Sequence, residues 1–406
     1  MVPSAGAAFM RAAHVQQVCG TDMRDMGFDG RIGFFEKFPF HGAMLRPVYE
    51  QLRERLDCLY TDDFQAMIDF RPAILLLAEH HNAFFRPHLP QTLVVSTTHG
   101  LGASKNYSAE SMPWFDIVCL PSQWYREYFV GRGWLPRLDF WVTGFPALDG
   151  ALSVPPPPAP APVAAARARG EPVLLFAPTY TPGLTALEVL PEQWMQALCA
   201  RHETLTIAVK LHPHTAARFP EWQALYQRLA AAQPRVVLLE DCDSNVYDLL
   251  PHADILLTDV SSVAFNFLAF DRPVVFVDNP RRQDSPRNEP DGLAWQWRDM
   301  GERVTSQEEL ERAVDRALAS PENLSPRRQE YRRRRFGELA DGGAAARIAG
   351  ALLDLVEPGA QQQPYVSVLR NALRSLSAAD QRNRQLQAAL QAPASGSYNV
   401  QFSYKP

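Results

Sequence analysis

The sequence predicts an α/β protein with two parallel-sheet domains that face a central cleft. Short apolar runs alternate with segments of helical spacing along most of the 406 residues, as in parallel sheets whose strands are buried on both faces. A proline-rich segment interrupts this alternation, which then begins again. The length also fits two ordinary domains better than one.

The first domain is predicted to span residues 30–150, after an irregular segment at 1–29. Its strands are expected where apolar runs are short, at 31–35, 72–78, 92–96, 116–120 and 139–143. Helices are expected where apolar residues recur every three or four positions, at 41–56 and 123–132. Helical connections between strands favour a parallel sheet.

Residues 151–170 are predicted to link the two domains. Four consecutive prolines at 155–158 and the Ala-Pro pairs after them favour extended polyproline II structure and cannot enter the interior of a sheet. A surface loop within one domain is the alternative. The alternation that restarts after this segment favours a linker.

The second domain is predicted to span residues 171–357. Strands are expected at 172–176, 205–211, 236–239, 254–257 and 273–277, and helices at 191–201, 221–231, 245–250, 307–319, 326–338 and 344–355. The composition then turns to Gln, Ser and Ala, which predicts a helical or flexible tail over 358–406, with a peripheral helix at 366–391.

Composition excludes several classes of protein. A net charge of −5 provides no basic surface for nucleic acid. The five cysteines are scattered, without a CxxC pair, which fits reduced thiols in a cytosolic protein. Neither a signal-peptide pattern nor an apolar run of membrane-span length occurs. We therefore expect a cytoplasmic protein. If its substrate is a membrane lipid or polymer, the protein must reach the inner face of the cell membrane from the cytosol. Composition leaves its oligomeric state open.

The segment 258–262, Thr-Asp-Val-Ser-Ser, follows the apolar run 255–257 and opens a segment of helical spacing. This layout predicts a strand end that leads into a helix N-terminus, where unpaired N–H groups favour a phosphate. Ser261 and Ser262 would add hydroxyl donors. In an open α/β sheet this edge binds ligands, so the pattern indicates an enzyme that handles a phosphate or pyrophosphate.

Two histidines follow predicted strands in the same manner. His212, within Lys210-Leu211-His212-Pro213, is expected to project from a loop because Pro213 sets a turn, with Lys210 on the same side. A polar strand cap is the alternative. His99-Gly100 follows the strand 92–96, and glycine allows close approach of the backbone to a ligand. A single histidine is commonly structural, but this position favours a role in catalysis.

Other segments are less specific. Thr179 follows the strand 172–176 and can lend its hydroxyl to a phosphate, although a plain turn fits as well. Asp241-Cys242-Asp243 resembles the metal-binding DxD pair of some glycosyltransferases, but Asp243-Ser244 precedes a helical pattern and favours capping. The sequence has no Walker loop, GxGxxG, HExxH or GxSxG motif.

Several ordered motifs resemble those of the CDP-glycerol glycerophosphotransferases, which include teichoic-acid primases and polymerases and related capsule polymerases. The resemblance covers most of residues 90–355. The matching motifs are His99-Gly100 with Lys105, Gly-Phe-Pro-Ala-Leu-Asp at 144–149, Ala-Pro-Thr at 177–179, Lys-Leu-His-Pro at 210–213, the serine-containing segment 258–267, and Asp-Gly-Gly-Ala-Ala-Ala-Arg-Ile at 341–348. Ala147, Val260 and Asn266 replace the family's usual Arg, Tyr and Asp.

The resemblance implies a GT-B fold with two Rossmann-like domains, in which an acceptor hydroxyl attacks the β-phosphorus of CDP-glycerol and releases CMP. The acceptor would be a cell-surface polymer or a lipid-linked molecule. We expect His99 to act as the base, with Gly100 and Lys105 on the acceptor side.

The remaining expected site residues belong to the second domain. His212 is expected to act in catalysis with His99 and to hold the pyrophosphate together with Thr179, Ser261 and Ser262. Lys210 would support the positive field or brace the loop. Asp259 would orient His212 or a ribose hydroxyl, or serve the structure alone. We expect no obligatory metal or other cofactor, because amides and side chains supply the donors.

Two other classes of function stay open. A GT-B glycosyltransferase or a nucleotide-sugar 2-epimerase would use the same sheet edge for a sugar nucleotide. A scaffold in surface-polymer assembly would need no catalysis, but the retention of both His99 and His212 argues against it. The sequence does not distinguish CDP-glycerol from CDP-ribitol, or a primase from a polymerase.

Overall fold

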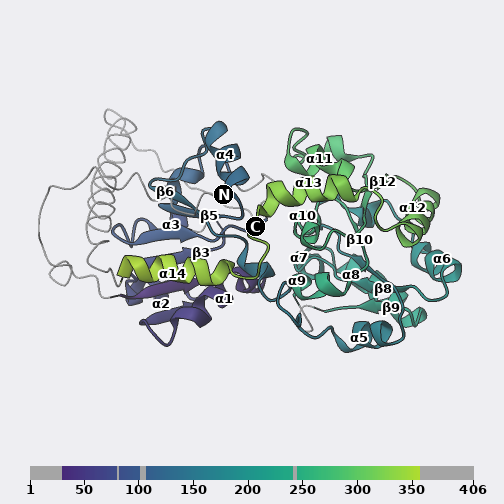
Figure 1. The fold of residues 1–406 in the computed structure, drawn as a ribbon, viewed down its shortest axis with the longest axis horizontal. Coiled ribbons are helices and arrows are strands. Elements are labelled where there is room, and N and C mark those ends of the chain that lie inside the picture. Colours follow the sequence, from purple (N-terminus) through teal and green to yellow (C-terminus); the bar gives the residue numbers. More distant parts are fainter. Residues whose placement is uncertain (1–29, 80–81, 101–106, 241–244, 357–406) are drawn as a thin grey trace, which may run out of the picture.

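The computed structural model describes residues 30–79, 82–100, 107–240 and 245–356. They form two α/β domains that lie side by side (Figure 1). Each domain has a parallel sheet of six strands, in the order β2-β1-β3-β4-β5-β6 in the first and β12-β11-β10-β7-β8-β9 in the second. The predicted pair of parallel-sheet domains is confirmed.

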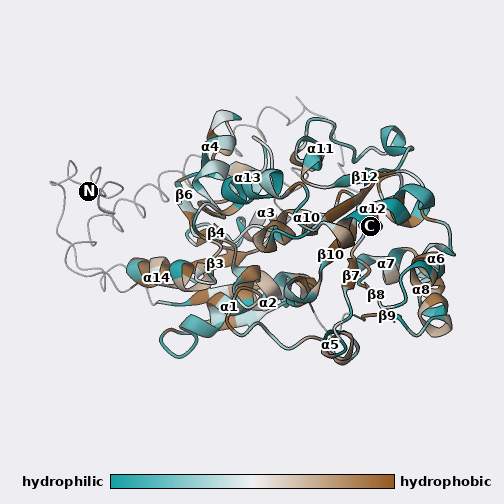
Figure 2. Cartoon of the chain, turned by 45° about the vertical axis from the view of Figure 1, so that its right-hand side comes forward, coloured by the Kyte–Doolittle hydropathy of each residue, from teal (hydrophilic) through white to brown (hydrophobic). Residues whose placement is uncertain are grey.

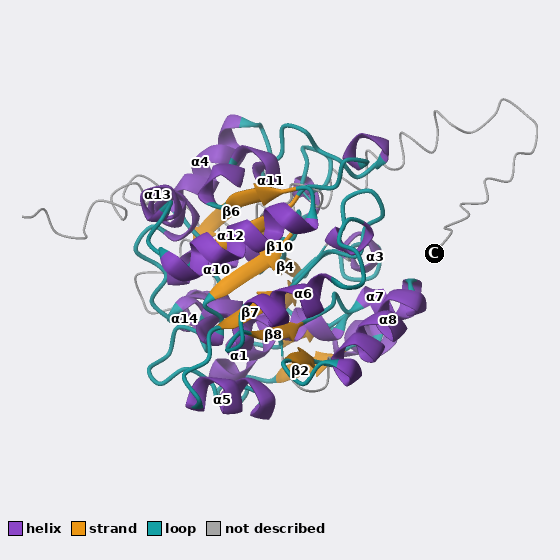
Figure 3. Cartoon of the chain, turned by 90° about the vertical axis from the view of Figure 1, so that its right-hand side faces the viewer, coloured by secondary structure: helices purple, strands orange, loops and turns teal. Residues whose placement is uncertain are grey.

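The strands of the first sheet are β1 (Ile32–Phe35), β2 (Cys58–Thr61), β3 (Ile74–Leu77), β4 (Leu93–Ser96), β5 (Ile117–Leu120) and β6 (Asp139–Val142). Those of the second are β7 (Val173–Phe176), β8 (Thr206–Val209), β9 (Val236–Leu238), β10 (Ile255–Thr258), β11 (Val274–Val277) and β12 (Glu302–Val304). Every predicted strand is present. The central strands are fully buried, as in β3 and β7, and helices surround the strands of the second sheet (Figure 3).

The helices of the first domain and the connection are α1 (Gly42–Leu52), α2 (Phe64–Phe70), α3 (Asn82–Phe85), α4 (Gln123–Gly131) and α5 (Ala161–Ala168). Those that follow are α6 (Trp194–Arg201), α7 (His214–Arg218), α8 (Pro220–Ala232), α9 (Val246–Leu249), α10 (Val263–Phe267), α11 (Leu293–Gln296), α12 (Gln307–Ala319), α13 (Ser325–Phe336) and α14 (Ala344–Val356). Apolar strands lie inside the domains and hydrophilic helices such as α12 and α13 outside (Figure 2).

Two segments differ from the domain boundaries predicted from sequence. Within the predicted linker 151–170, residues 161–168 form α5, which packs on β7 and β8 with Val163 and Ala166 buried. Within the predicted second domain 171–357, α14 leaves that domain and packs on α1 of the first (Figure 1). The periodicity of the sequence predicts that α14 has an apolar face, but it does not predict which domain that face packs against.

The return of α14 to the first domain joins two of the motifs. Asp149 accepts hydrogen bonds from the backbone N–H groups of Ala344 (3.0 Å) and Ala345 (2.6 Å) at the start of α14. Arg347 donates to the carbonyl of Thr143 at 2.7 Å. Gly144 has φ +90°, and a Cβ there would lie 3.0 Å from the Cβ of Ala344. These contacts give the segments 144–149 and 341–348 a structural role.

The predicted N-terminal segment 1–29, the tail 358–406 and its helix at 366–391 lie outside the described residues. In the ranges that are described, none of the helices has the length and apolar character needed to cross a bilayer.

Candidate active site

A cavity of about 390 Å³ lies between the two domains, within the size range of small-molecule sites. Its first-domain wall consists of Phe38, Pro39, Phe40 and His99, and its second-domain wall of Ala177, Pro178, Lys210, Leu211, His212, Pro213, His214, Asn245, Val246, Tyr247, Ser261, Ser262 and Val263. His99, His212, Lys210, Ser261 and Ser262, which were singled out from the sequence, therefore face a single cavity.

Strand direction explains why these residues meet. The lining segments follow the carboxyl ends of β1 and β4 in the first sheet and of β7, β8, β9 and β10 in the second. In the second sheet β7 and β10 are neighbours, and the chain order changes direction between them. Ligands bind at such switch points in open α/β sheets.

Backbone geometry places His99 in the wall. Thr98 and Gly100 on either side have φ values of +61° and +67°, which are uncommon for a β-branched residue and ordinary for glycine. The Thr98 hydroxyl donates to the carbonyl of Cys119 at 3.2 Å, and the backbone N–H of His99 donates to the Tyr107 hydroxyl at 3.1 Å. The turn is therefore held from two sides.

His99 is a neutral imidazole at physiological pH. Burial lowers its pKa to about 4; the carboxylate of Glu79 opposes this shift and His41 adds to it. The Nδ1 atom of His99 is buried and accepts no hydrogen bond from the described residues. A neutral imidazole can accept a proton from a substrate hydroxyl.

A second part of the first-domain wall was not predicted. The ring of Phe40 lies 5.1 Å from that of His99, 6.1 Å from His212 and 5.6 Å from His214, so one aromatic ring contacts imidazoles of both domains. The segment Phe-Pro-Phe-His at 38–41 follows β1. The strand-end rule that located His99 would have located these residues too.

Behind Phe40 lies an imidazole–carboxylate pair. His41 is buried, with its Nε2 3.5 Å from Oε1 of Glu79, which follows β3. The ring of His41 lies 5.6 Å from the ring of His99. Glu79 thus places a negative charge behind the proposed base.

His212 is oriented to donate a hydrogen bond. Its Nδ1 accepts the backbone N–H of His214 at 3.1 Å, which assigns the proton of the neutral ring to Nε2. Lys210 is buried, and its ammonium donates to the carbonyl of Glu240 at 2.8 Å, at the end of β9. That hydrogen bond braces the loop, which was one of the two roles expected for Lys210.

The structure places Asp259 and Thr179 behind the wall. The fully buried Asp259 carboxylate accepts N–H groups of Thr179 (2.9 Å), Ala186 (2.9 Å) and Ser261 (3.2 Å). Thr179 is itself buried, and neither residue lines the cavity. Since backbone donors occupy the carboxylate, the structural alternative for Asp259 is favoured over contact with His212 or a ribose.

The two serines lie where the domains approach each other. The N-cap residue Ser262 makes no side-chain capping hydrogen bond, so capping does not consume its hydroxyl. A Cβ on Gly100 of the first domain would lie 3.9 Å from its Oγ. The helix α10 has only five residues, so its dipole would contribute little to phosphate binding. The serine hydroxyls and the backbone N–H groups are then the donors for a phosphate.

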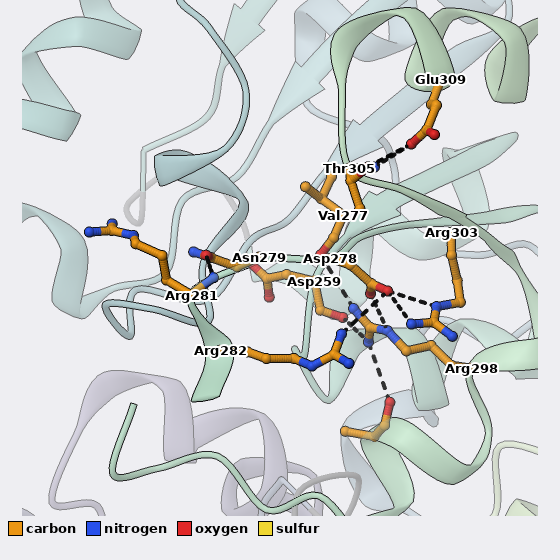
Figure 4. Close-up of polar contacts among 11 residues, drawn as sticks. Asp259, Val277, Asp278, Asn279, Arg281, Arg282, Arg298, Arg303, Thr305 and Glu309 are labelled. Carbon is orange, nitrogen blue, oxygen red and sulfur yellow. Dashed lines mark hydrogen bonds and ion pairs between the residues drawn. The ribbon is translucent and has the colours of Figure 1, made fainter. Parts of the chain in front are cut away.

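Arg298 stabilises the segment that carries the two serines. It is buried and donates from Nε to Asp278 at 2.7 Å and from Nη1 to the carbonyl of Asp259 at 3.0 Å (Figure 4). Arg303 donates to the other oxygen of Asp278 at 2.7 Å. Arg298 thus joins Asp259, at the end of β10, to Asp278, at the end of β11. The carboxylate of Asp259 in turn binds the N–H of Thr179 in the loop after β7.

Three other sequence-based predictions concern Lys105, the DxD-like segment and the N-cap of α9. Lys105 and Asp241-Cys242-Asp243 lie outside the described residues. The N-cap of α9 is Asn245, which accepts the N–H of Tyr247 at 3.1 Å, and not the predicted Asp243-Ser244 pair. Within the described ranges, no group of three or more His, Cys, Asp or Glu side chains is placed to hold a metal ion.

Comparison with known proteins assigns the family. The model of the CDP-glycerol:poly(glycerophosphate) glycerophosphotransferase family matches residues 116–354, more than half of the chain. No curated protein sequence matches significantly.

Solved structures agree on the fold. The wall teichoic acid polymerase TagF superposes with a TM-score of 0.62 at 12% identity, over 81% of this chain and 90% of that one. The Staphylococcus aureus MnaA–UDP complex gives 0.56 at 13% identity, over 81% and 97%. The UDP-GlcNAc 2-epimerase of Neisseria meningitidis, bound to UDP-GlcNAc, gives 0.52 at 13%, over 80% and 99%. The expected GT-B fold is confirmed.

Proposed function

The chain belongs to the CDP-glycerol:poly(glycerophosphate) glycerophosphotransferase family, and we propose that its interdomain cavity is where glycerol phosphate passes from CDP-glycerol to the acceptor. The acceptor we propose is a hydroxyl of a cell-surface polymer or of a lipid-linked molecule. The observation that carries this proposal is the convergence of His99 with His212, Ser261 and Ser262 on one cavity of ligand size.

In the proposed reaction the acceptor oxygen attacks the β-phosphorus of CDP-glycerol. A new phosphorus–oxygen bond forms, the bond from the β-phosphorus to the bridging oxygen breaks, and CMP leaves. The hydroxyl proton passes to His99. Positioning and stabilisation of charge supply most of the catalysis in such transfers.

The environment of His99 suits a base that becomes charged only when the substrates are present. Burial keeps the pKa of the free imidazole low. A bound diphosphate would add negative charge near it and favour the imidazolium, as Glu79 already does from behind. A positioned general base contributes about 10²-fold to 10⁴-fold in rate.

The second-domain wall would hold the leaving group. The Nε2–H of His212, with the hydroxyl and amide groups of Ser261 and Ser262, provides donors for phosphate oxygens. Asp259 and Lys210 hold the loops that carry these donors. We propose that the reaction needs no obligatory metal. Activity that EDTA abolishes and Mg²⁺ restores would contradict this.

The test is release of CMP from CDP-glycerol in the presence of a poly(glycerol phosphate) or lipid-linked acceptor. We expect His99→Ala to lower turnover about 10²-fold to 10⁴-fold with little change in CDP-glycerol affinity, measured by calorimetry. His212→Ala should weaken donor binding as well. His88→Ala is a matched control, since His88 packs on Phe64 and does not line the cavity. Unchanged turnover in His99→Ala would remove His99 from the mechanism.

Because 2-epimerases share this fold, the alternative to CDP-glycerol is a sugar nucleotide. A ligand that binds the folded state raises its apparent stability, so thermal shifts with CDP-glycerol, CDP-ribitol and UDP-sugars separate the alternatives. Stabilisation by a UDP-sugar alone would favour the sugar-nucleotide function. We further propose that the protein works from the cytoplasm, in peripheral contact with the membrane that carries its acceptor, which cell fractionation tests.

A further inference from the structure

Beside the cavity, two arginines converge on one tyrosine. The guanidinium of Arg218 lies over the ring of Tyr180, 5.4 Å from its centroid. Nη1 of Arg287 donates to the Tyr180 hydroxyl at 3.3 Å. Tyr180 follows β7, Arg218 ends α7 and Arg287 lies in the loop after β11. We call these three residues the Tyr180 cluster.

Both guanidinium groups of the cluster keep their charge available. Arg218 and Arg287 are exposed, and in the described ranges neither forms an ion pair with a carboxylate. Two carboxylates of this domain, Glu188 and Asp278, pair with other arginines. Glu188 pairs with Arg281 at 2.9 Å.

Asp278 is likewise occupied. It binds Arg298 and Arg303 and lies 3.8 Å from Arg282 (Figure 4). Arginines in this part of the molecule therefore mostly have acidic partners, and the two of the Tyr180 cluster are exceptions.

The cluster adjoins the proposed reaction site. The ring of Tyr180 lies 4.5 Å from that of His212 and 5.2 Å from that of His214, and both histidines line the cavity. The pKa of His214 is lowered, first by burial and then by the charge of Arg218, with a further contribution from Arg287. The charges of the cluster thus reach the cavity wall.

We propose that Arg218 and Arg287, held by Tyr180, form a second anion subsite that binds a phosphodiester group of the acceptor chain next to its reacting end. This inference rests on the proposed function. Guanidinium groups bind phosphate oxygens through paired, charge-assisted hydrogen bonds. The donor diphosphate is assigned to the serines and His212 inside the cavity, so a phosphate held outside that wall belongs to the other substrate.

Binding tests the subsite without relying on turnover. We expect Arg218→Gln and Arg287→Gln each to weaken the binding of a short glycerol phosphate oligomer about tenfold, with a larger loss in the double variant. CDP-glycerol affinity should stay within about twofold of wild type. Raising the salt concentration should weaken oligomer binding to wild type more than to the double variant. Arg312→Gln on α12 is the control, because it removes one exposed arginine of the same domain outside the cluster.

Three results would overturn the inference. The first is a double variant that binds the oligomer as tightly as wild type does. A parallel loss of CDP-glycerol affinity would assign the arginines to the donor. Loss of binding to phosphatidylglycerol vesicles with oligomer binding intact would make the cluster a membrane contact. Thermal unfolding of each variant checks that the fold is kept, which exposed side chains should allow.

The experiments distinguish a wrong subsite assignment from a wrong proposed function. Should wild type neither bind CDP-glycerol nor release CMP, the proposed function is wrong. Should wild type do both while the double variant holds the oligomer unchanged, only the subsite is wrong. Tyr180→Phe refines the assignment, because it removes the hydroxyl that positions Arg287 and keeps the ring under Arg218. We expect it to weaken oligomer binding less than the loss of either arginine.

Discussion

Glu79 is a residue whose role depends on charge more than on packing. Its carboxylate pairs with the buried His41 at 3.5 Å, and His41 lies against His99. Because the negative charge of Glu79 raises the pKa of His99 against the effect of burial, it stabilises the imidazolium that would form in the reaction.

Glu79→Gln should therefore move the pH profile as well as the rate. Loss of kcat/KM on the acid side reports protonation of His99 in the free enzyme. Without the carboxylate the pKa of His99 falls further, so this limb should move to lower pH. The rate at neutral pH should also fall, because the imidazole is a weaker base. Glu79→Asp should restore part of both.

The exposed Glu110 provides the matched control, Glu110→Gln. A purely structural role for Glu79 would lower the rate without moving the acid limb, and that result would refute the electrostatic assignment.

Asp259 presents the opposite case, a residue that acts through hydrogen bonds to the backbone. In Asp259→Asn one carboxylate oxygen becomes an NH2 group that accepts no hydrogen bond. The N–H of Ser261, which donates to Oδ1, or that of Ala186, which donates to Oδ2, then loses its acceptor. We expect the free energy of unfolding to fall by about 1–3 kcal/mol, measured by urea denaturation, with weaker CDP-glycerol binding. A variant with unchanged stability but lost binding would instead indicate direct contact with the donor.

Among the elements, α14 depends most on a contact that is distant in sequence. Asp149 caps it across the domain, and loss of such a cap costs about 0.5–2 kcal/mol. Asp149→Ala should lower the free energy of unfolding by about that amount. Asp354→Ala, at the exposed and unfavourable C-terminal end of the same helix, should leave it unchanged or raise it slightly. Equal effects of both would rule out capping.

The sequence predicted the central strands because burial on both faces produces continuous apolar runs, as in β3 and β7. It missed β2 and β12, which lie at sheet edges and are partly exposed, with Glu302 and Arg303 in β12. The strand-end rule found His99 and the serines. It passed over His41 and Glu79, since their relation to His99 arises only when separate loops meet in the folded domain.

At the scale of the whole molecule, α13 lies at the junction of the two domains. Its Arg335 is fully buried, donates to Oδ1 of Asn266 at 2.9 Å and stands over the rings of Tyr125 and Phe145. In the described ranges no carboxylate pairs with it. A buried cation without an ionic partner is costly.

Asn266→Asp should stabilise the molecule, because it places a carboxylate where Asn266 now accepts a hydrogen bond from the Arg335 guanidinium. We expect the free energy of unfolding to rise by about 1–3 kcal/mol at neutral pH. The gain should disappear at low pH as the new carboxyl is protonated. Asn266→Ala, which removes the existing hydrogen bond, should lower stability. A fall in stability for Asn266→Asp would mean that desolvation of the new charge exceeds the attraction.

The central claim is that both domains act on one diphosphate in the cavity between them. Its most direct test is a crystal structure of the His99→Ala variant with CDP-glycerol. The account predicts diphosphate oxygens within hydrogen-bond distance of His212 Nε2 and of the Ser261–Ser262 segment, with the β-phosphorus facing the vacated imidazole position. A diphosphate bound elsewhere, or one that contacts only the first domain, would contradict it.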